Sequence, residues 1–193
     1  MACRSAILID NFLEENLFNS LSSKVAESPQ YTSGEFAEVR DDLWKEVTRS
    51  VFQRLKEIGL YQHHFKDSAK ITNFSINQYR PSNYGHGNFN GPHFDHGAYV
   101  FYIHPHWDES WEGKLKITKA VEEEYRTAIF AKPNRFIWIN PHTLHDISTT
   151  SVNTEHARVT NLGFLGGEFQ TNPIGVEYIN ILRPIRLLSS ENK

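Results

Sequence analysis

In the first third of the chain, apolar residues recur with the spacing of an α-helix. Leu13, Leu17, Leu21 and Val25 lie four positions apart, and Asp10 precedes them at a position suited to an N-cap. The "SPQ" that follows ends the pattern, because proline cannot continue a helix. The spacing therefore predicts a helix that begins after Asp10 and ends before residue 28.

A second stretch of helical spacing begins after Asp41 or Asp42 and closes at Gly59, a residue suited to a helix C-cap. Its apolar positions form one stripe, made of Leu43, Val47, Val51, Leu55 and Ile58. A helix with a single apolar stripe needs a surface to cover it. We therefore expect both helices to pack one face against a sheet.

From Lys70 onward the period changes to two, which is typical of half-buried strands. "KITNFSINQYR" alternates apolar and polar residues, and "PSNYGHGNFNGP" after it is rich in Gly, Asn and Pro, which predicts a loop. Further strand candidates are "HFDHGAYVFYI", "GKLKIT", "TAIFA", "RFIWIN", "HDISTTSV", "ARVTNLGFLG" and, in the tail, "VEYINIL". Many short strands joined by turns predict a mainly β fold with flanking helices, of the sandwich, barrel or jelly-roll kind.

Composition narrows the class of protein without indicating an activity. The 193 residues suffice for one domain with a buried core, and a net charge of -3 gives no sign of nucleic-acid binding. Cys3 is the only cysteine, which excludes a disulfide within this chain and a multi-cysteine zinc site. No signal peptide and no membrane-spanning apolar run stand out, so we expect a cytoplasmic protein without membrane contact. Nothing in the sequence indicates the oligomeric state.

The candidate chemistry lies in the stretch "NGPHFDHGAYVFYIHPHW", which holds four of the ten histidines. In an extended chain, His93 and Asp95 point to the same face, because strand side chains alternate. A metal ion would need a third ligand, and His145 in "INPHTLHDIS" is the best candidate, with His142 as its competitor. Two histidines and one carboxylate form a triad that leaves coordination positions open, as a catalytic site requires.

Each of these residues also has an ordinary structural explanation. A single His-x-Asp is common by chance, and the other histidines could be surface groups or outer partners of a site. Arg158 stands in the apolar pattern "HARVTNLGFL", where an arginine reaches solvent, joins a structural ion pair or binds an anionic ligand. Trp107, Trp111 and Trp138 are expected to be packing residues.

Taken in order, these segments resemble the Fe(II)/2-oxoglutarate-dependent oxygenases, in particular their prolyl-4-hydroxylase-like branch. The resemblance covers residues 71–165, about half the chain, through "HFD", "WEGKLKI", "NRFIWIN", "LHDIS" and "RVT". It implies a double-stranded β-helix, or jelly-roll, core at residues 70–170. Residues 1–65 would give helical support and residues 171–193 a C-terminal strand and tail, all in one domain of residues 1–193.

The resemblance also implies a role for each candidate residue. His93, Asp95 and His145 would bind Fe(II) as the catalytic triad. The contacts to 2-oxoglutarate would come from Arg158, Tyr102, Tyr79 and Thr160. Both tyrosines could equally be core aromatics. One departure from the family is the pair Glu112–Gly113, since two glycines often precede the leucine of that strand.

The implied reaction is hydroxylation of a C–H bond by O2, coupled to conversion of 2-oxoglutarate to succinate and CO2, with ascorbate as a supporting reductant. An aspartate at position 95 favours hydroxylation, because halogenating relatives carry a small residue there. The expected substrate is a prolyl or other peptidyl residue, or an amino-acid-like molecule. Two other classes stay open: a cupin-like metal enzyme that does not use 2-oxoglutarate, and a non-catalytic jelly-roll binding module.

Overall fold

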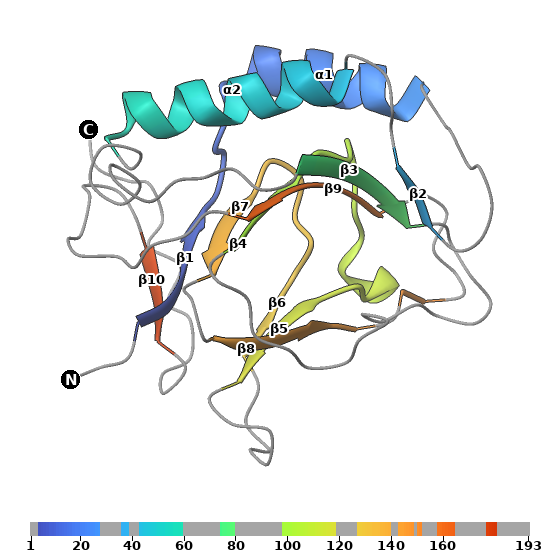
Figure 1. Cartoon of the computed structure of the whole chain (residues 1–193). Helices are drawn as coiled ribbons and strands as arrows, with labels where there is room; N and C mark the ends of the chain where they lie inside the picture. Colours follow the sequence, from blue (N-terminus) through green and yellow to red (C-terminus); the bar gives the residue numbers. More distant parts are fainter. Residues whose placement is uncertain are drawn as a thin grey trace.

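Two antiparallel sheets lie one above the other, and two helices cover the outer face of the larger sheet (Figure 1). The computed structural model describes residues 4–27, 36–38, 43–59, 74–79, 98–118, 127–139, 143–148, 150–151, 158–164 and 177–180. The larger sheet has the strand order β10-β1-β7-β4-β9-β3-β2, and the smaller has the order β6-β5-β8. This is a double-stranded β-helix, or jelly-roll, core packed by N-terminal helices, so the predicted fold class is confirmed.

The elements follow one another as β1 (Arg4–Ile9), α1 (Glu15–Glu27), β2 (Phe36–Glu38), α2 (Leu43–Glu57), β3 (Phe74–Tyr79), β4 (Ala98–Tyr102), the 3₁₀ helix η1 (Glu109–Trp111), β5 (Leu115–Thr118), β6 (Thr127–Ile129), β7 (Phe136–Ile139), β8 (Leu144–Ile147), β9 (Arg158–Phe164) and β10 (Glu177–Asn180). Each strand from β3 to β10 overlaps one of the segments that were predicted as strands, and β8 begins one residue before the segment "HDISTTSV".

Helix α2 agrees with the prediction from its spacing. It begins at Leu43, its apolar stripe is buried against the larger sheet, and Gly59 follows its end with a φ of 72°. In this left-handed region glycine meets no steric penalty, which explains its place at the helix end. Among the described residues, no helix is long and apolar enough to cross a membrane.

Helix α1 differs from the prediction at its start and on its buried face. It begins at Glu15, five residues after Asp10, so Asp10 does not cap it, and the Asp10 carboxylate binds Arg135. Phe18 is buried with the rest of the stripe, whereas Leu17 is 42% exposed. Leu17 and Phe18 are both apolar neighbours about 100° apart on the helix, so spacing alone did not distinguish them.

The strands β1 and β2 were not predicted, since the first third was expected to be helical. β1 lies between β10 and β7 in the larger sheet, and both of its faces are covered. Ile7 packs under the helices, while Ala6 and Leu8 pack between the sheets. A strand buried on both faces shows a continuous apolar run rather than alternation, which is why the pattern did not reveal it.

Strand β4 separates the two cores of the molecule. All five of its residues are buried. Tyr99 and Phe101 belong to the core under α1 and α2, and Val100 and Tyr102 to the core between the sheets. The alternation of a strand therefore divides β4 into an outer face that supports the helices and an inner face that looks into the jelly roll.

Candidate functional site

Three of the predicted cosubstrate residues meet on the inner face of the larger sheet. Tyr102 of β4 pairs directly with Thr160 of β9, so the two side chains share one face, and Arg158 lies two residues earlier on the same face. All three are buried, and Arg158 is only 1% exposed. The Cζ atom of Arg158 lies 6.0 Å from the centroid of the Tyr102 ring.

The aliphatic part of Arg158 packs against the bend that precedes β5. A Cβ atom built on Gly113 would lie 3.0 Å from Arg158 Cδ, 3.1 Å from Thr150 Cγ2 and 3.2 Å from the Trp107 ring. The hydroxyl groups of Thr150 and Thr160 are buried and have no hydrogen-bond partner among the described residues. A buried hydroxyl without a partner is costly, so these two groups suit a site that receives a polar ligand.

His145 lies on the smaller sheet, in β8. It pairs with Ile117 of β5, whose side chain belongs to the core between the sheets, so the imidazole also faces inward. His145 is 6% exposed, and its Nδ1 lies 2.9 Å from the carbonyl oxygen of Thr143. A carbonyl only accepts, so Nδ1 carries the proton and the lone pair resides on Nε2, the form in which an imidazole binds a metal.

The remaining predicted residues lie wholly or partly outside the described residues. His93, Asp95 and the competitor His142 fall outside them, so their distances to His145 stay a prediction. The backbone of Tyr79 pairs with Arg158, but its side chain lies outside the described part. Within the described residues, no three His, Cys, Asp or Glu side chains could hold a metal ion together.

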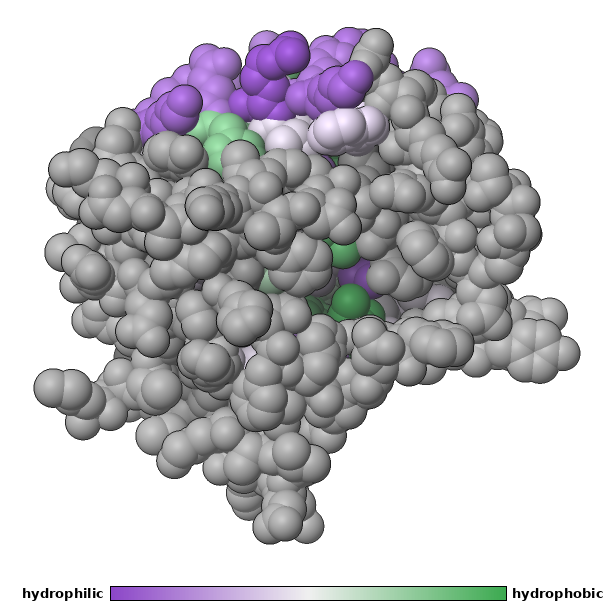
Figure 2. Space-filling view, in the orientation of Figure 1, coloured by the Kyte–Doolittle hydropathy of each residue, from purple (hydrophilic) through white to green (hydrophobic). Residues whose placement is uncertain are grey.

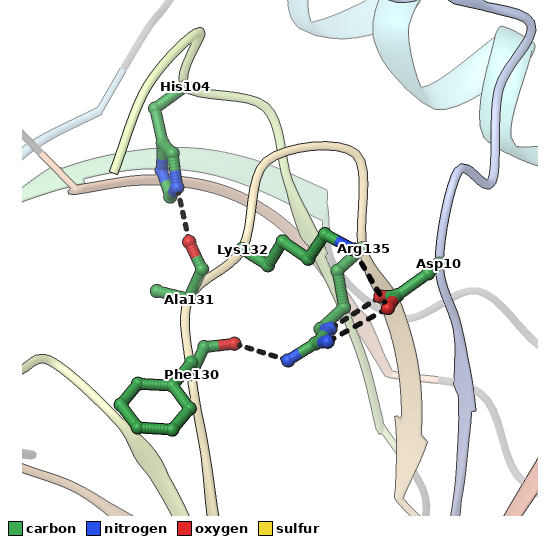
Figure 3. A network of polar contacts seen from close by, with 6 residues as sticks. All are labelled: Asp10, His104, Phe130, Ala131, Lys132 and Arg135. Carbon is green, nitrogen blue, oxygen red and sulfur yellow. Dashed lines mark hydrogen bonds and ion pairs between the residues drawn. The ribbon is translucent and has the colours of Figure 1, made fainter. Parts of the chain in front are cut away.

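Sequence reasoning did not single out His104, which is buried rather than a surface histidine. Its Nε2 donates to the Ala131 carbonyl at 2.6 Å (Figure 3), and its Nδ1 accepts from the Val159 N–H at 3.2 Å. Burial, with a contribution from the charge of Arg158, lowers the pKa of His104 to about 3. The signal in the sequence was its position two residues after Tyr102, on the same face. By contrast, His106 is exposed.

Among the described residues, one group suits an anionic ligand, and one imidazole, that of His145, could bind a metal ion. Arg158 supplies a buried positive charge, and Tyr102, Thr150 and Thr160 supply hydroxyl groups near it. A guanidinium suits a carboxylate, because its N–H groups match the two oxygens. Trp107 and Trp111 pack edge to face at 5.4 Å and close the core beside these groups. In Figure 2, apolar and hydrophilic atoms are visible at the bottom of a hollow below the helices.

Comparison with solved structures identifies the fold. A prolyl hydroxylase from Trichoplax adhaerens, in complex with a hypoxia inducible factor oxygen degradation domain peptide, is 14% identical with a TM-score of 0.55, over 86% of this chain and 84% of that one. The viral collagen prolyl hydroxylase of Paramecium bursaria Chlorella virus-1, in its 2-oxoglutarate complex, is 13% identical with a TM-score of 0.56, over 86% and 98%. A 2-oxoglutarate-Fe(II) oxygenase family oxidoreductase from Burkholderia pseudomallei is 11% identical with a TM-score of 0.59, over 84% of each chain.

No protein-family model matches the sequence, and no curated protein matches it either. The structural likeness nevertheless extends over 84% to 86% of the chain. The chain therefore has the fold of the 2-oxoglutarate/Fe(II) oxygenases, a group that includes the prolyl hydroxylases.

Proposed function

We propose that the protein is an Fe(II)- and 2-oxoglutarate-dependent oxygenase that hydroxylates a C–H bond and releases succinate and CO2. The observation that carries this proposal is the buried guanidinium of Arg158 on the inner face of the larger sheet, beside Tyr102 and Thr160. The N–H groups of a guanidinium match the two oxygens of a carboxylate, so a dicarboxylate cosubstrate would suit this buried position.

In this proposal the chain provides binding and orientation. Arg158 binds the distal carboxylate of 2-oxoglutarate, and the hydroxyls of Tyr102 and Thr160 donate to it, with Tyr79 as a further contact. His93, Asp95 and His145 would hold Fe(II), which when bound would activate O2, the oxidant of the reaction. The Thr143 carbonyl keeps the proton of His145 on Nδ1 and so presents Nε2 to the metal.

The buried setting also serves the chemistry. Val100, Leu115 and Ile117 line the core between the sheets together with the two tryptophans, so water has little access to the Arg158 region. Excluding water strengthens the attraction between a guanidinium and a carboxylate.

For the substrate, we propose a prolyl or other peptidyl residue first and a free amino acid second. A structural neighbour in complex with a peptide and a viral collagen prolyl hydroxylase both support a peptide or protein substrate. O2 is the second cosubstrate, and ascorbate would keep the iron reduced.

The decisive experiment is mass-spectrometric detection of succinate formed from 2-oxoglutarate by the Fe(II)-loaded protein, with and without proline-containing peptides and amino acids. Arg158→Met should abolish succinate formation, whereas Arg49→Met, at an exposed position of α2, should leave it unchanged. Unchanged succinate formation in Arg158→Met would show that Arg158 does not bind the cosubstrate, and no succinate from the wild-type protein would instead favour a metal enzyme that does not use 2-oxoglutarate.

Metal binding is tested separately by anaerobic titration with Fe(II) and 2-oxoglutarate, in which bidentate chelation gives a weak visible absorption band. His145→Ala should lose this band, and His106→Ala, at an exposed histidine, should keep it. A wild-type protein that gives no band would point to a binding module without iron.

A further inference from the structure

His104 is a buried group that the proposed reaction does not use, and both of its ring nitrogens contact backbone. Nε2 lies 2.6 Å from the carbonyl oxygen of Ala131, which only accepts, so Nε2 carries the proton. Nδ1 lies 3.2 Å from the nitrogen of Val159, whose N–H only donates, so Nδ1 carries the lone pair. The neutral tautomer with its proton on Nε2 satisfies both contacts. In a protonated ring, the N–H at Nδ1 would face the N–H of Val159, and that hydrogen bond would be lost.

These contacts continue the link between β4 and β9 beyond their last regular pair. The pairing ends at Tyr102 and Thr160. Beyond it, the Ile103 N–H donates to the Val159 carbonyl at 3.1 Å, and the Val159 N–H donates to the ring of His104. Val159 is therefore held through both of its backbone groups, and one of the two bonds comes from a side chain.

Arg158 directly precedes Val159, so the backbone that His104 holds is the backbone that carries the guanidinium. The three side chains also form one cluster. The Tyr102 ring lies 5.6 Å from the His104 ring, and its centroid lies 6.0 Å from Arg158 Cζ. A neutral imidazole suits this cluster, because a second positive charge beside Arg158 would be buried with the first.

We propose that His104 is a positioning residue for Arg158. Its neutral imidazole ties the start of β9 to the end of β4 and to Ala131 after β6, and so determines where the Arg158 guanidinium lies. The identity of the anion that Arg158 then binds, 2-oxoglutarate, rests on the proposed function; the positioning itself does not.

Two substitutions separate the two contacts of the ring. In His104→Asn the shorter side chain places an amide oxygen near the position of Nδ1, where it can accept from the Val159 N–H. In His104→Gln the longer side chain places an amide nitrogen near the position of Nε2, where it can donate to Ala131. The positioning role requires the Val159 contact, so only His104→Gln should release Arg158.

The first measurement is calorimetric binding of 2-oxoglutarate to the anaerobic Fe(II) protein. His104→Gln should weaken binding roughly tenfold, the order of effect expected for the loss of one buried hydrogen bond, and His104→Asn should restore most of it. Tyr99→Phe is the control, because it removes the buried Tyr99–Asn161 hydrogen bond of 2.9 Å on the other face of β4. Equal losses of affinity in Tyr99→Phe and His104→Gln would mean that His104→Gln acts only by destabilising the fold in general, and this would overturn the proposal.

The second measurement needs no ligand. Hydrogen exchange of the Arg158 Nε–H and the Val159 amide, followed by NMR, should be slow in the wild-type protein and in His104→Asn and faster in His104→Gln. Equal exchange in all three proteins would overturn the positioning role. If the wild-type protein binds no 2-oxoglutarate, the proposed function fails, while this comparison still decides the role of His104.

Discussion

Gly113 and Arg158 are in such close contact that a Cβ atom on the glycine would lie 3.0 Å from Cδ of the arginine. Gly113 also has a φ of 65°, in the left-handed region that favours glycine. The backbone between η1 and β5 thus supports the stem of the buried arginine. Steric and conformational constraints therefore coincide at this residue.

Replacing Gly113 with alanine should impair both stability and binding. The left-handed backbone costs a residue with a Cβ about 1 kcal/mol, and the contact with Arg158 adds to it. We expect the free energy of unfolding in urea to fall by about 1–3 kcal/mol. The affinity for 2-oxoglutarate should fall with it, because the arginine must move.

The matched control for this change is Gly59→Ala at the end of α2. Gly59 has a φ of 72°, so the backbone cost is similar, but the residue lies outside the core between the sheets. It should lower stability without changing the affinity for 2-oxoglutarate. A similar loss of affinity in both variants would mean that Gly113 has no specific effect on Arg158.

Replacing Glu112 with glycine should make the protein more stable. Its φ of 59° and ψ of -132° lie in a region that non-glycine residues rarely occupy. Relief of this strain should raise the free energy of unfolding by about 1 kcal/mol in Glu112→Gly. Glu112→Gln keeps the backbone cost and removes only the half-exposed ion pair to Lys114, so it should change stability little. A Glu112→Gly protein no more stable than Glu112→Gln would contradict the prediction.

The elements that periodicity could predict are those with one covered face or one dominant stripe. Helix α2 has such a stripe, with Val47 and Val51 fully buried and the opposite side exposed, as the hydrophilic outer surface in Figure 2 shows. β1 could not be found in this way, because Ile7 and Leu8 are both buried, on opposite faces. Its place in the sheet depends on pairing with β7 and β10, which are distant in sequence.

The candidate site shows the same division. Alternation alone places Arg158 and Thr160 on one face of a strand. That Tyr102 joins them depends on the register between β4 and β9, which is a long-range property. The contact of Gly113 with Arg158 and the two backbone bonds of His104 depend on distances between loops and strands, so no local pattern indicates them.

The stability of the protein should decline in mild acid because of His104. Burial lowers its pKa from 6.5 to about 3, so the unfolded chain binds a proton that the folded protein does not. The contribution of His104 to the free energy of unfolding is therefore fully present above about pH 6.5. It is lost as the pH falls toward 3, by up to about 1.4 kcal/mol per pH unit. Between pH 7 and pH 5 this group alone should lower the free energy of unfolding by about 2 kcal/mol.

Urea unfolding at several pH values checks this expectation in variants of two histidines. His104→Gln should flatten the dependence between pH 7 and pH 5, although it also lowers stability overall. His106→Gln, at an exposed histidine, should retain the wild-type slope. Identical slopes in His104→Gln and the wild-type protein would show that His104 is not the responsible group.

The ion pair between Asp10 and Arg135 should contribute more to stability than the other charges around it. Arg135 Nε and Nη2 donate to the two oxygens of Asp10 at 2.6 and 2.9 Å, and its Nη1 donates to the Phe130 carbonyl at 3.0 Å (Figure 3). Burial opposes ionisation of Asp10, but the hydrogen bonds and charge of Arg135, with Lys132, outweigh it and lower its pKa. Asp10→Asn leaves a buried guanidinium without its charge partner, so the free energy of unfolding at pH 7 should fall by about 2 kcal/mol. Lys132→Met removes an exposed partner of the same carboxylate and should cost less than about 0.5 kcal/mol.

Because a lowered pKa contributes stability only above its value, the deficit of Asp10→Asn relative to the wild-type protein should shrink as the pH falls below 3.8. Urea unfolding at pH 7 and at low pH measures both effects, and equal losses in the two variants at pH 7 would show that the bidentate geometry adds nothing.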